Sequence, residues 1–155
     1  MNSNYEFRSI TKDIRRHPEF QKLKKLRHHK RDIYYHCIRV SHLSYIWAKK
    51  LNLDPISAAR GGLLHDFFTY DWRLEGQLKH KKLFEKHGFT HSKEALSNAQ
   101  IFFVINGKEA DIIAKHMFPL TLSFPKYKES WLVSAVDKYV TISEYLNNAR
   151  TRAGL

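Results

Sequence analysis

The apolar residues of the chain recur mainly at helical spacing, and no stretch sustains the alternation that is typical of a strand. The clearest example is the segment 32–51, where Asp32 is a candidate N-cap for a predicted helix. The apolar positions at helical spacing in this segment are Ile33, Val40, Leu43, Trp47 and Leu51. A second helix start follows at Asp54-Pro55, because Asp is a preferred N-cap and Pro suits the first helical position. These patterns predict an all-α fold.

Turn and loop signals separate the remaining predicted helices. Thr90 is a candidate cap for one of them, and Asn106-Gly107 marks a turn before the next. Residues 70–88 are polar and basic, and we expect mostly loop there. The predicted ranges are 10–26, with an interruption at Pro18, then 91–102, 108–117 and 128–148.

Several histidines and aspartates occupy positions inside the apolar stripes of these helices. Asp137, for example, stands between Val133 and Val140. An aspartate is rarely buried without a partner, because an unpaired carboxylate in apolar surroundings is costly. The inward-facing polar residues are His36, His65, Asp66, His116 and Asp137. Side chains of these two types can satisfy one another by ligating a metal ion.

Each of these residues also has an ordinary structural interpretation. A single inward histidine is more often a hydrogen-bonded core residue than a metal ligand. Asp66 is a candidate cap for the turn that follows it, and Asp137 is a candidate ion-pair partner for a nearby Lys or Arg. Small residues precede the His65-Asp66 pair and would let another helix approach closely: Ala58, Ala59, Gly61 and Gly62. Both interpretations are open at this point, although the occurrence of several such residues together favours a metal.

The charge balance adds a cationic surface to this picture. The chain has 155 residues, which suits one compact domain, and its hydrophobic fraction of 43% excludes overall disorder. It contains 27 Lys and Arg against 15 Asp and Glu, a net charge of +12, together with ten histidines. This combination suits a phosphate-rich partner, either nucleic acid or a phosphorylated small molecule.

The composition excludes several classes of site. Cys37 is the only cysteine, which rules out an internal disulfide framework and a zinc site of several cysteines. Neither a GxGxxG pattern nor a P-loop occurs. The first residues are polar and charged, unlike the apolar core of a signal peptide, and the apolar runs are too short to span a membrane. We therefore expect a cytoplasmic protein without a membrane partner.

The order of the polar residues resembles the pattern of the HD-domain superfamily of metal-dependent phosphohydrolases. That pattern has a His on one helix, an adjacent His-Asp pair on the next and a distant Asp on a later helix. The matching residues are His36 in YYHCIRV, His65-Asp66 in GGLLHDFF and Asp137 in SAVDKYV. The resemblance implies a single-domain bundle of about six to seven helices over residues 30–148, with a packed helical extension over 1–29 and a tail over 149–155.

Superfamily members that hold two metals add two histidines between the pair and the last aspartate, and His91 and His116 are the candidates here. His87 is a rival for His91, one turn earlier. The resemblance implies one ion at the four-residue pattern and a second at the added histidines, with Asp66 bridging them. Such ligands suit divalent transition metals, with Fe or Mn expected first and Zn, Ni, Co or Mg as alternatives.

The reaction implied by this resemblance is hydrolysis of a nucleotide or another small phosphate ester by a water activated between the two metals, with Asp66 as a catalytic residue. Asp71 follows the His-Asp helix and is a candidate proton donor, with a plain turn residue as the alternative. The candidate contacts to substrate phosphate are Arg39, Arg73 and Lys82, for which the alternative is an ordinary solvated surface.

The sequence also departs from parts of the superfamily. Thr69 stands where several two-metal relatives have a lysine, and no Gly-Tyr-Pro signature supports a cyclic dinucleotide as substrate. Two other functions compete with phosphate-ester hydrolysis. One is a di-iron oxygenase that uses the same ligand set to cleave a cyclic polyol, and the other is a basic nucleic-acid-binding protein with a structural metal site.

Overall fold

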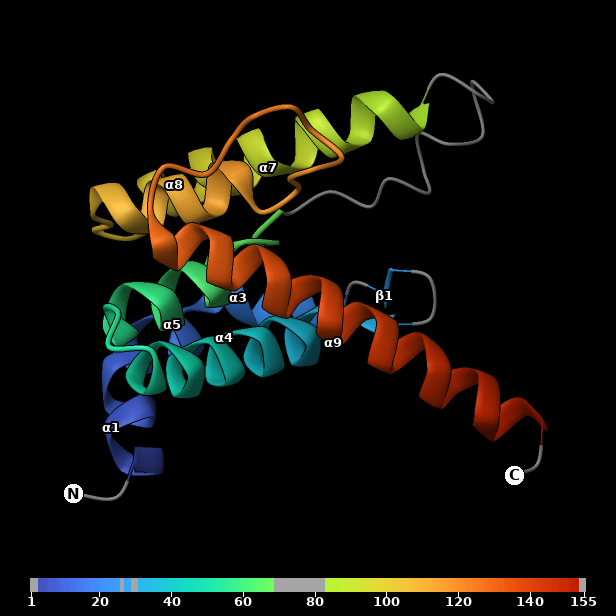
Figure 1. Ribbon diagram of the computed structural model, residues 1–155, viewed down its shortest axis with the longest axis horizontal. Coiled ribbons are helices and arrows are strands. Elements are labelled where there is room, and N and C mark those ends of the chain that lie inside the picture. Colours follow the sequence, from blue (N-terminus) through green and yellow to red (C-terminus); the bar gives the residue numbers. More distant parts are fainter. Residues whose placement is uncertain (1–2, 26, 29–30, 69–82, 154–155) are drawn as a thin grey trace.

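The computed structural model describes residues 3–25, 27–28, 31–68 and 83–153, and these form a bundle of helices with one small two-stranded ribbon (Figure 1). The N-terminal part contains α1 (Ser3–Ile10), α2 (Lys12–Arg16), α3 (Pro18–Gln21) and the 3-10 helix η1 (Lys22–Lys25). The ribbon pairs β1 (Arg27–His28) antiparallel to β2 (Arg31–Asp32). The longer helices are α4 (Ile33–Lys50), α5 (Pro55–Leu64), α7 (Leu83–Phe102), α8 (Gly107–Lys115) and α9 (Lys128–Ala153). The predicted all-α fold is confirmed.

Side-chain caps begin three of the helices that hold or precede the candidate residues, α4, α5 and α8. Asp32 accepts a hydrogen bond from the backbone N–H of Tyr35 at the start of α4. Asp54 accepts from the backbone N–H of Ser57 at 3.0 Å, with Pro55 in the first turn of α5. Asn106 and Glu109 form a reciprocal capping box at the start of α8. These caps satisfy N–H groups that have no partner within their own helix, so they fix where each helix begins.

Three helix boundaries differ from the predicted ones. The first helical segment begins at Ser3, earlier than the predicted residue 10, although the interruption at Pro18 is confirmed by the extended backbone of His17. Helix α7 begins at Leu83, so Thr90 lies inside the helix and does not cap it. Helix α9 continues to Ala153, beyond the predicted end at residue 148. Once a helix is nucleated, each added residue gains a hydrogen bond, and polar residues at a surface do not stop its growth.

The packed face of α4 also differs from the predicted apolar stripe. Trp47 and Leu51 are 46% and 54% exposed, so their predicted burial is wrong. The buried positions of this helix are Ile33, His36, Cys37, Val40, Ser41, Ser44, Tyr45 and Ala48. The small side chains Ser41 and Ser44 allow α5 to approach α4 closely, and this close packing selects the buried face over the alternative with more apolar residues.

Helix α5 lies between two close neighbours because its buried face is made of small residues. A Cβ atom added at Gly61 would lie 2.8 Å from Cδ1 of Ile112 in α8, and one added at Gly62 would lie 3.3 Å from Cα of Ser41 in α4. The close approach predicted from the small residues is therefore confirmed. Its consequence is that the C-terminal ends of α5 and α8 meet near the N-terminal turn of α4, where His36 lies.

Two buried clusters hold these helices in place. The first joins the N-terminal segment to the bundle, since Phe20 and Leu23 are fully buried with Leu63, Leu64 and Ile113. The second lies where α9 crosses α4, α5 and α8 (Figure 1). Its members are Val40, Ala48, Ala58, Ile112, Val133, Val136 and Val140. Burial of each Val, Leu, Ile or Phe side chain in these clusters stabilises the fold by about 1.5–3 kcal/mol, so the surroundings of the site are well fixed. The domain boundaries at residues 29 and 148 stay predictions.

A search of the described residues for a helix that is both long and apolar enough to cross a membrane finds none.

Candidate metal centre

Six side chains from five helical segments meet where α5 and α8 end. They form two groups, and within each group the candidate ligand atoms lie within 4.8 Å of one another. The first group is His36 of α4, His65 after α5 and Asp137 of α9, and the second is Asp66 after α5, His91 of α7 and His116 after α8. The structure therefore brings together every residue of the predicted ligand set.

Two of the histidines are oriented by the same kind of hydrogen bond to the preceding helical turn. His65 directly follows the last residue of α5, and its Nδ1 donates a hydrogen bond to the carbonyl oxygen of Gly62 at 2.8 Å. His116 directly follows α8, and its Nδ1 donates to the carbonyl oxygen of Ile113 at 2.8 Å. Carbonyl groups of a last helical turn have no partner within the helix, so they are free to accept these bonds. The bond fixes Nδ1 as a donor and turns Nε2 toward the site.

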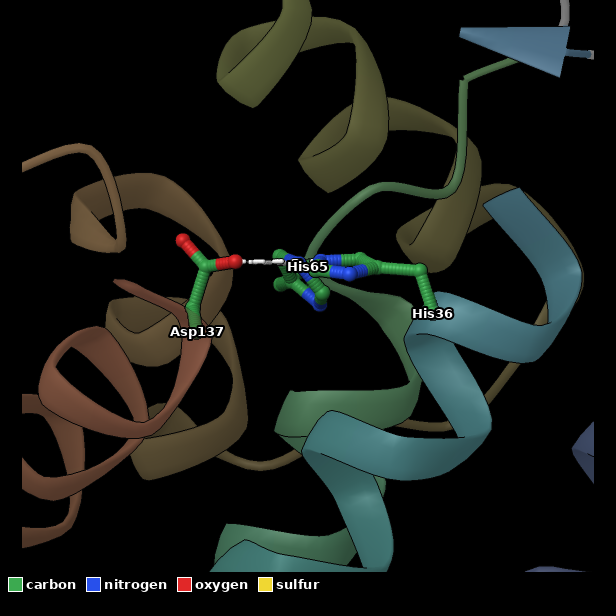
Figure 2. Close-up of side chains that lie close together, drawn as sticks. All are labelled: His36, His65 and Asp137. Carbon is green, nitrogen blue, oxygen red and sulfur yellow. Dashed lines mark hydrogen bonds and ion pairs between the residues drawn. The ribbon is translucent and has the colours of Figure 1, made fainter. Parts of the chain in front are cut away.

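The first group is shown in Figure 2, where His36, His65 and Asp137 point toward one another from three different helical segments. Oδ1 of Asp137 lies 3.1 Å from Nε2 of His36 and 3.5 Å from Nε2 of His65. The partners of Asp137 in this group are thus histidines, whereas the ordinary structural interpretation predicts a Lys or Arg. Within the described residues, the buried Nε2 of His65 has no hydrogen-bond partner. A buried imidazole nitrogen in this state is suited to a metal ion.

The ligand atoms of the second group lie equally close to one another. Nε2 of His91 and Nε2 of His116 are 3.2 Å apart, and they lie 3.5 Å and 3.4 Å from Oδ1 of Asp66. Two imidazole nitrogens and one carboxylate oxygen therefore form a small triangle. His91 is the less buried histidine, with a side chain that is 19% exposed.

Asp66 stands between the groups with one oxygen toward each. Its Oδ2 lies 3.4 Å from Nε2 of His65, and its Oδ1 faces His91 and His116. A carboxylate in this position can ligate two ions at once, because each oxygen has its own set of neighbouring histidines. The predicted bridging role of Asp66 has this arrangement as its geometric support.

The spacing of these atoms fits a transition metal. Ligand atoms about 2.1 Å from a tetrahedral ion lie about 3.4 Å apart. In the first group, Oδ1 of Asp137 lies 3.1–3.5 Å from the two histidine nitrogens, and in the second group all three ligand atoms are 3.2–3.5 Å apart. Imidazole nitrogens and carboxylate oxygens are the ligands that divalent Mn, Fe, Co, Ni and Zn accept. The donor set and its spacing therefore agree.

The electrostatics of the centre keep both carboxylates ionised. Burial raises the pKa of Asp66, but the neighbouring His65 and His116 outweigh this effect and hold that pKa well below its ordinary value. Burial also raises the pKa of Asp137, and His36 and His65 reverse the shift in the same way, so that its pKa is lowered. Two negative charges, on side chains that are 22% and 14% exposed, thus face the histidines at neutral pH.

The histidines show the opposite shift. Burial lowers the pKa of His65, but Asp66 and Asp137 outweigh it and raise that pKa well above its ordinary value. Burial also lowers the pKa of His36, and its contacts with Asp137 and Glu144 raise it overall. The carboxylates therefore favour positive charge at these nitrogens, and a divalent cation can supply it in place of protons.

Two residues that support the centre were not predicted from the sequence. Glu144 lies with Oε2 at 3.1 Å from Nδ1 of His36. Lys138 donates from Nζ to the carbonyl oxygen of His116 at 2.9 Å and to Oγ of Ser134 at 2.8 Å. Glu144 follows Asp137 by two helical turns on the same face of α9, and this spacing is a signal that could have identified it.

Of the residues predicted to contact substrate phosphate, only Arg39 lies within the described part of the chain. Arg39 lies next to the centre, but its guanidinium is 3.0 Å from Oε1 of Glu144 and donates to Oγ of Ser143, while its side chain stays 45% exposed. Asp71, Arg73 and Lys82 lie outside the described residues, as does the side chain of His87. The substrate contacts of Arg39, Arg73 and Lys82, the proton-donor role of Asp71 and the choice of His91 over His87 as a ligand all stay predictions.

Cys37 belongs to the core and not to the chemistry of the centre. Its side chain is fully buried among the residues of the first core cluster. Burial raises the pKa of the Cys37 thiol well above its ordinary value, so the thiol stays protonated. The interpretation of this residue as core packing is confirmed.

Comparison with known proteins gives one match. The family model described as the HD domain matches residues 33–142, which is well over half of the chain and includes all six residues of the centre. The chain therefore belongs to the HD domain family. No curated protein and no solved structure matches it in the other two comparisons.

Proposed function

We propose that this HD-domain chain is a metal-dependent phosphohydrolase with two divalent transition-metal ions bridged by Asp66. HD domains are generally metal-dependent hydrolases, and two groups of His and Asp side chains here can hold metal. The observation that carries the two-metal proposal is the orientation of Asp66, whose two oxygens face different histidines.

The ligands divide unevenly between the ions. His36, His65 and Asp137 would hold the first ion, His91 and His116 the second, and Asp66 would serve both. We expect Fe or Mn in both positions, with Zn, Ni, Co or Mg as alternatives. When bound, such ions supply a water that is activated near neutral pH and positive charge that stabilises the phosphoryl group.

The residues of the chain have their own tasks in this proposal. The hydrogen bonds from Nδ1 of His65 and His116 hold both rings in position, so no reorganisation is needed when substrate arrives. Asp71 remains the candidate proton donor to the leaving group. No serine or cysteine nucleophile is required, which agrees with the buried, protonated state of Cys37.

We further propose a small phosphorylated substrate, foremost a nucleotide. The net charge of +12 favours anionic partners, and Arg39, Arg73 and Lys82 are the candidate contacts to phosphate. Cys37 is the only cysteine in the sequence, so no internal disulfide is possible; this suits a reducing compartment, and on this basis we propose a cytoplasmic protein.

The test is metal analysis together with hydrolysis assays on the full chain. The protein is purified without chelator, its metal content is measured, and a generic phosphomonoester and phosphodiester are assayed before and after removal and return of Mn²⁺ or Fe²⁺. We expect two ions per chain and hydrolysis that is lost with the metal and regained with it. A matched control is His42→Gln, because His42 lies on α4 but bonds to Asn4, outside both groups.

Other outcomes would overturn the proposal in different ways. A protein without metal before and after soaking would refute metal dependence altogether. One ion per chain would refute the bridging role of Asp66. Oxygen uptake by the iron-loaded protein with a cyclic polyol, and no phosphate release, would favour the di-iron oxygenase. Salt-dependent binding of nucleic acid that is unchanged in Asp66→Asn, without hydrolysis, would favour the binding protein.

A further inference from the structure

The three most buried histidines of the centre differ in what accepts a hydrogen bond from their Nδ1 atoms. His65 and His116 each follow the end of a helix, and each donates to a carbonyl oxygen of the turn before it. His36 lies inside α4, which runs from Ile33 to Lys50. The carbonyl groups in the interior of a helix already accept bonds from N–H groups four residues later, so they are not free to orient His36.

An acidic residue from another helix takes this role for His36. Oε2 of Glu144 in α9 lies 3.1 Å from Nδ1 of His36, while Nε2 of the same ring lies 3.1 Å from Asp137. The ring is therefore held between two carboxylates, one on each side. Since Nε2 is the atom that faces the first group, Nδ1 is the atom that donates to Glu144.

Glu144 is itself fixed by a cation. Nη1 of Arg39 lies 3.0 Å from Oε1 of Glu144, and Nη2 of the same guanidinium donates to Oγ of Ser143 at 3.2 Å. The side chain of Glu144 is only 13% exposed, whereas that of Arg39 is 45% exposed, so solvent reaches this contact from the side of Arg39. His36 and Arg39 lie one turn apart on α4. Both contact Glu144 of α9, and Arg39 also contacts the preceding residue, Ser143.

We propose that Glu144 is a positioning residue that orients His36 for the first metal ion, and that Arg39 acts through Glu144 rather than on the metal. This inference rests on the proposed function. A carboxylate that accepts from the second nitrogen of a ligating histidine fixes the tautomer, holds the ring and makes it a better ligand. The alternative is that Glu144 and Arg39 form an ion pair that only joins α4 to α9.

The test measures metal affinity and stability in the same set of variants. Mn²⁺ or Co²⁺ is titrated into the metal-free full chain of the wild type, Glu144→Leu and Glu144→Gln, and thermal unfolding is followed in chelator. We expect Glu144→Leu to weaken one of the two ions by about 10–100-fold. Glu144→Gln keeps an acceptor oxygen without the charge, so it should regain part of this loss. The visible spectrum of the Co²⁺ form should change for one ion only.

Glu129→Gln is the matched control. Glu129 is also a buried acid of α9, but it contacts Lys108 and the backbone N–H of Asp54, away from the centre. We expect it to lower the unfolding temperature without changing either metal affinity. If Glu144→Leu behaves in the same way, with both ions bound as tightly as in the wild type, Glu144 is only part of an ion pair and the inference is wrong.

Arg39 gives an independent check. We expect Arg39→Ala to weaken the same ion as Glu144→Leu does, but by less, and to cause no further loss when combined with Glu144→Leu. A loss that adds fully in the double variant would contradict action through Glu144. A wild-type protein that binds no divalent ion would overturn the proposed function itself, which distinguishes that failure from a failure of this inference.

Discussion

The two halves of the candidate centre are built differently, although they share Asp66. The first half draws His36, His65 and Asp137 from the crossing of α4, α5 and α9, where the second core cluster also lies. The second half depends on His91 of α7, whose side chain is more exposed than those of the other three histidines of the centre. Core packing thus surrounds the first half, whereas the second half includes the partly exposed His91, and we expect a substrate to approach from that side.

The largest expected effect is that of removing the residue common to both halves. Asp66→Asn keeps the shape of the side chain but removes the charge that the surrounding histidines stabilise. We expect activity to fall by about a thousandfold or more, which corresponds to about 4 kcal/mol in the activation free energy. Metal content per chain, measured by elemental analysis, should fall at both positions. A variant that lost only one ion would show that the halves are independent and that Asp66 does not bridge them.

A smaller and unequal effect is expected when one histidine is changed in each half. His65→Gln leaves the carbonyl of Gly62 without its buried donor, so we expect a loss of about 1–3 kcal/mol in the free energy of unfolding together with loss of the first ion. His91→Gln should lose the second ion and lower the unfolding free energy by less than His65→Gln does, because its side chain is partly exposed whereas that of His65 is fully buried.

Urea unfolding in chelator, with metal content measured separately, checks this pair of variants. Equal losses of stability in His65→Gln and His91→Gln would contradict the difference between the first half, which core packing surrounds, and the second half, which includes the partly exposed His91. The chelator matters because bound metal would itself stabilise the folded state and obscure the difference.

The smallest effect on activity is expected from a change in the spacing of two helices. Gly61→Ala places a Cβ atom 2.8 Å from Ile112, which forces α5 and α8 apart at a cost of about 1–3 kcal/mol in the free energy of unfolding. Since His116 follows α8 while His65 and Asp66 follow α5, affinity for the second ion should fall more than affinity for the first. Metal titration and thermal unfolding measure the two effects.

Gly107→Ala is the control for this spacing effect. The nearest atom to its added Cβ is Oη of Tyr127 at 3.8 Å, an ordinary contact, so we expect no loss of stability or metal affinity. A Gly61→Ala protein that behaved like Gly107→Ala would mean that the close approach of α5 and α8 does not set the position of His116.

Prediction from the sequence worked best where a local signal decides the outcome. Asp32, Asp54 and Pro18 act on the backbone next to them, and the structure has a helix start at each of these places. It failed where distant packing decides. Thr90 looks like a cap but lies within α7, and Trp47 looks like a core residue but is exposed, because close contact between α4 and α5 selects a face with serines.

The sequence by itself indicated the helical class of the fold and the inward-facing His36, His65, Asp66, His116 and Asp137, because capping, helical spacing and polar residues in an apolar stripe are all visible along the chain. His91 was named only through the resemblance to the HD superfamily, with His87 as its rival. Only the tertiary structure decided how these residues are combined. The orientation of each oxygen of Asp66 and the contact between Glu144 and His36 depend on how closely α5 approaches α4 and α8, and on where α9 crosses them. Such distances result from packing between segments far apart in the chain, and no local pattern encodes them.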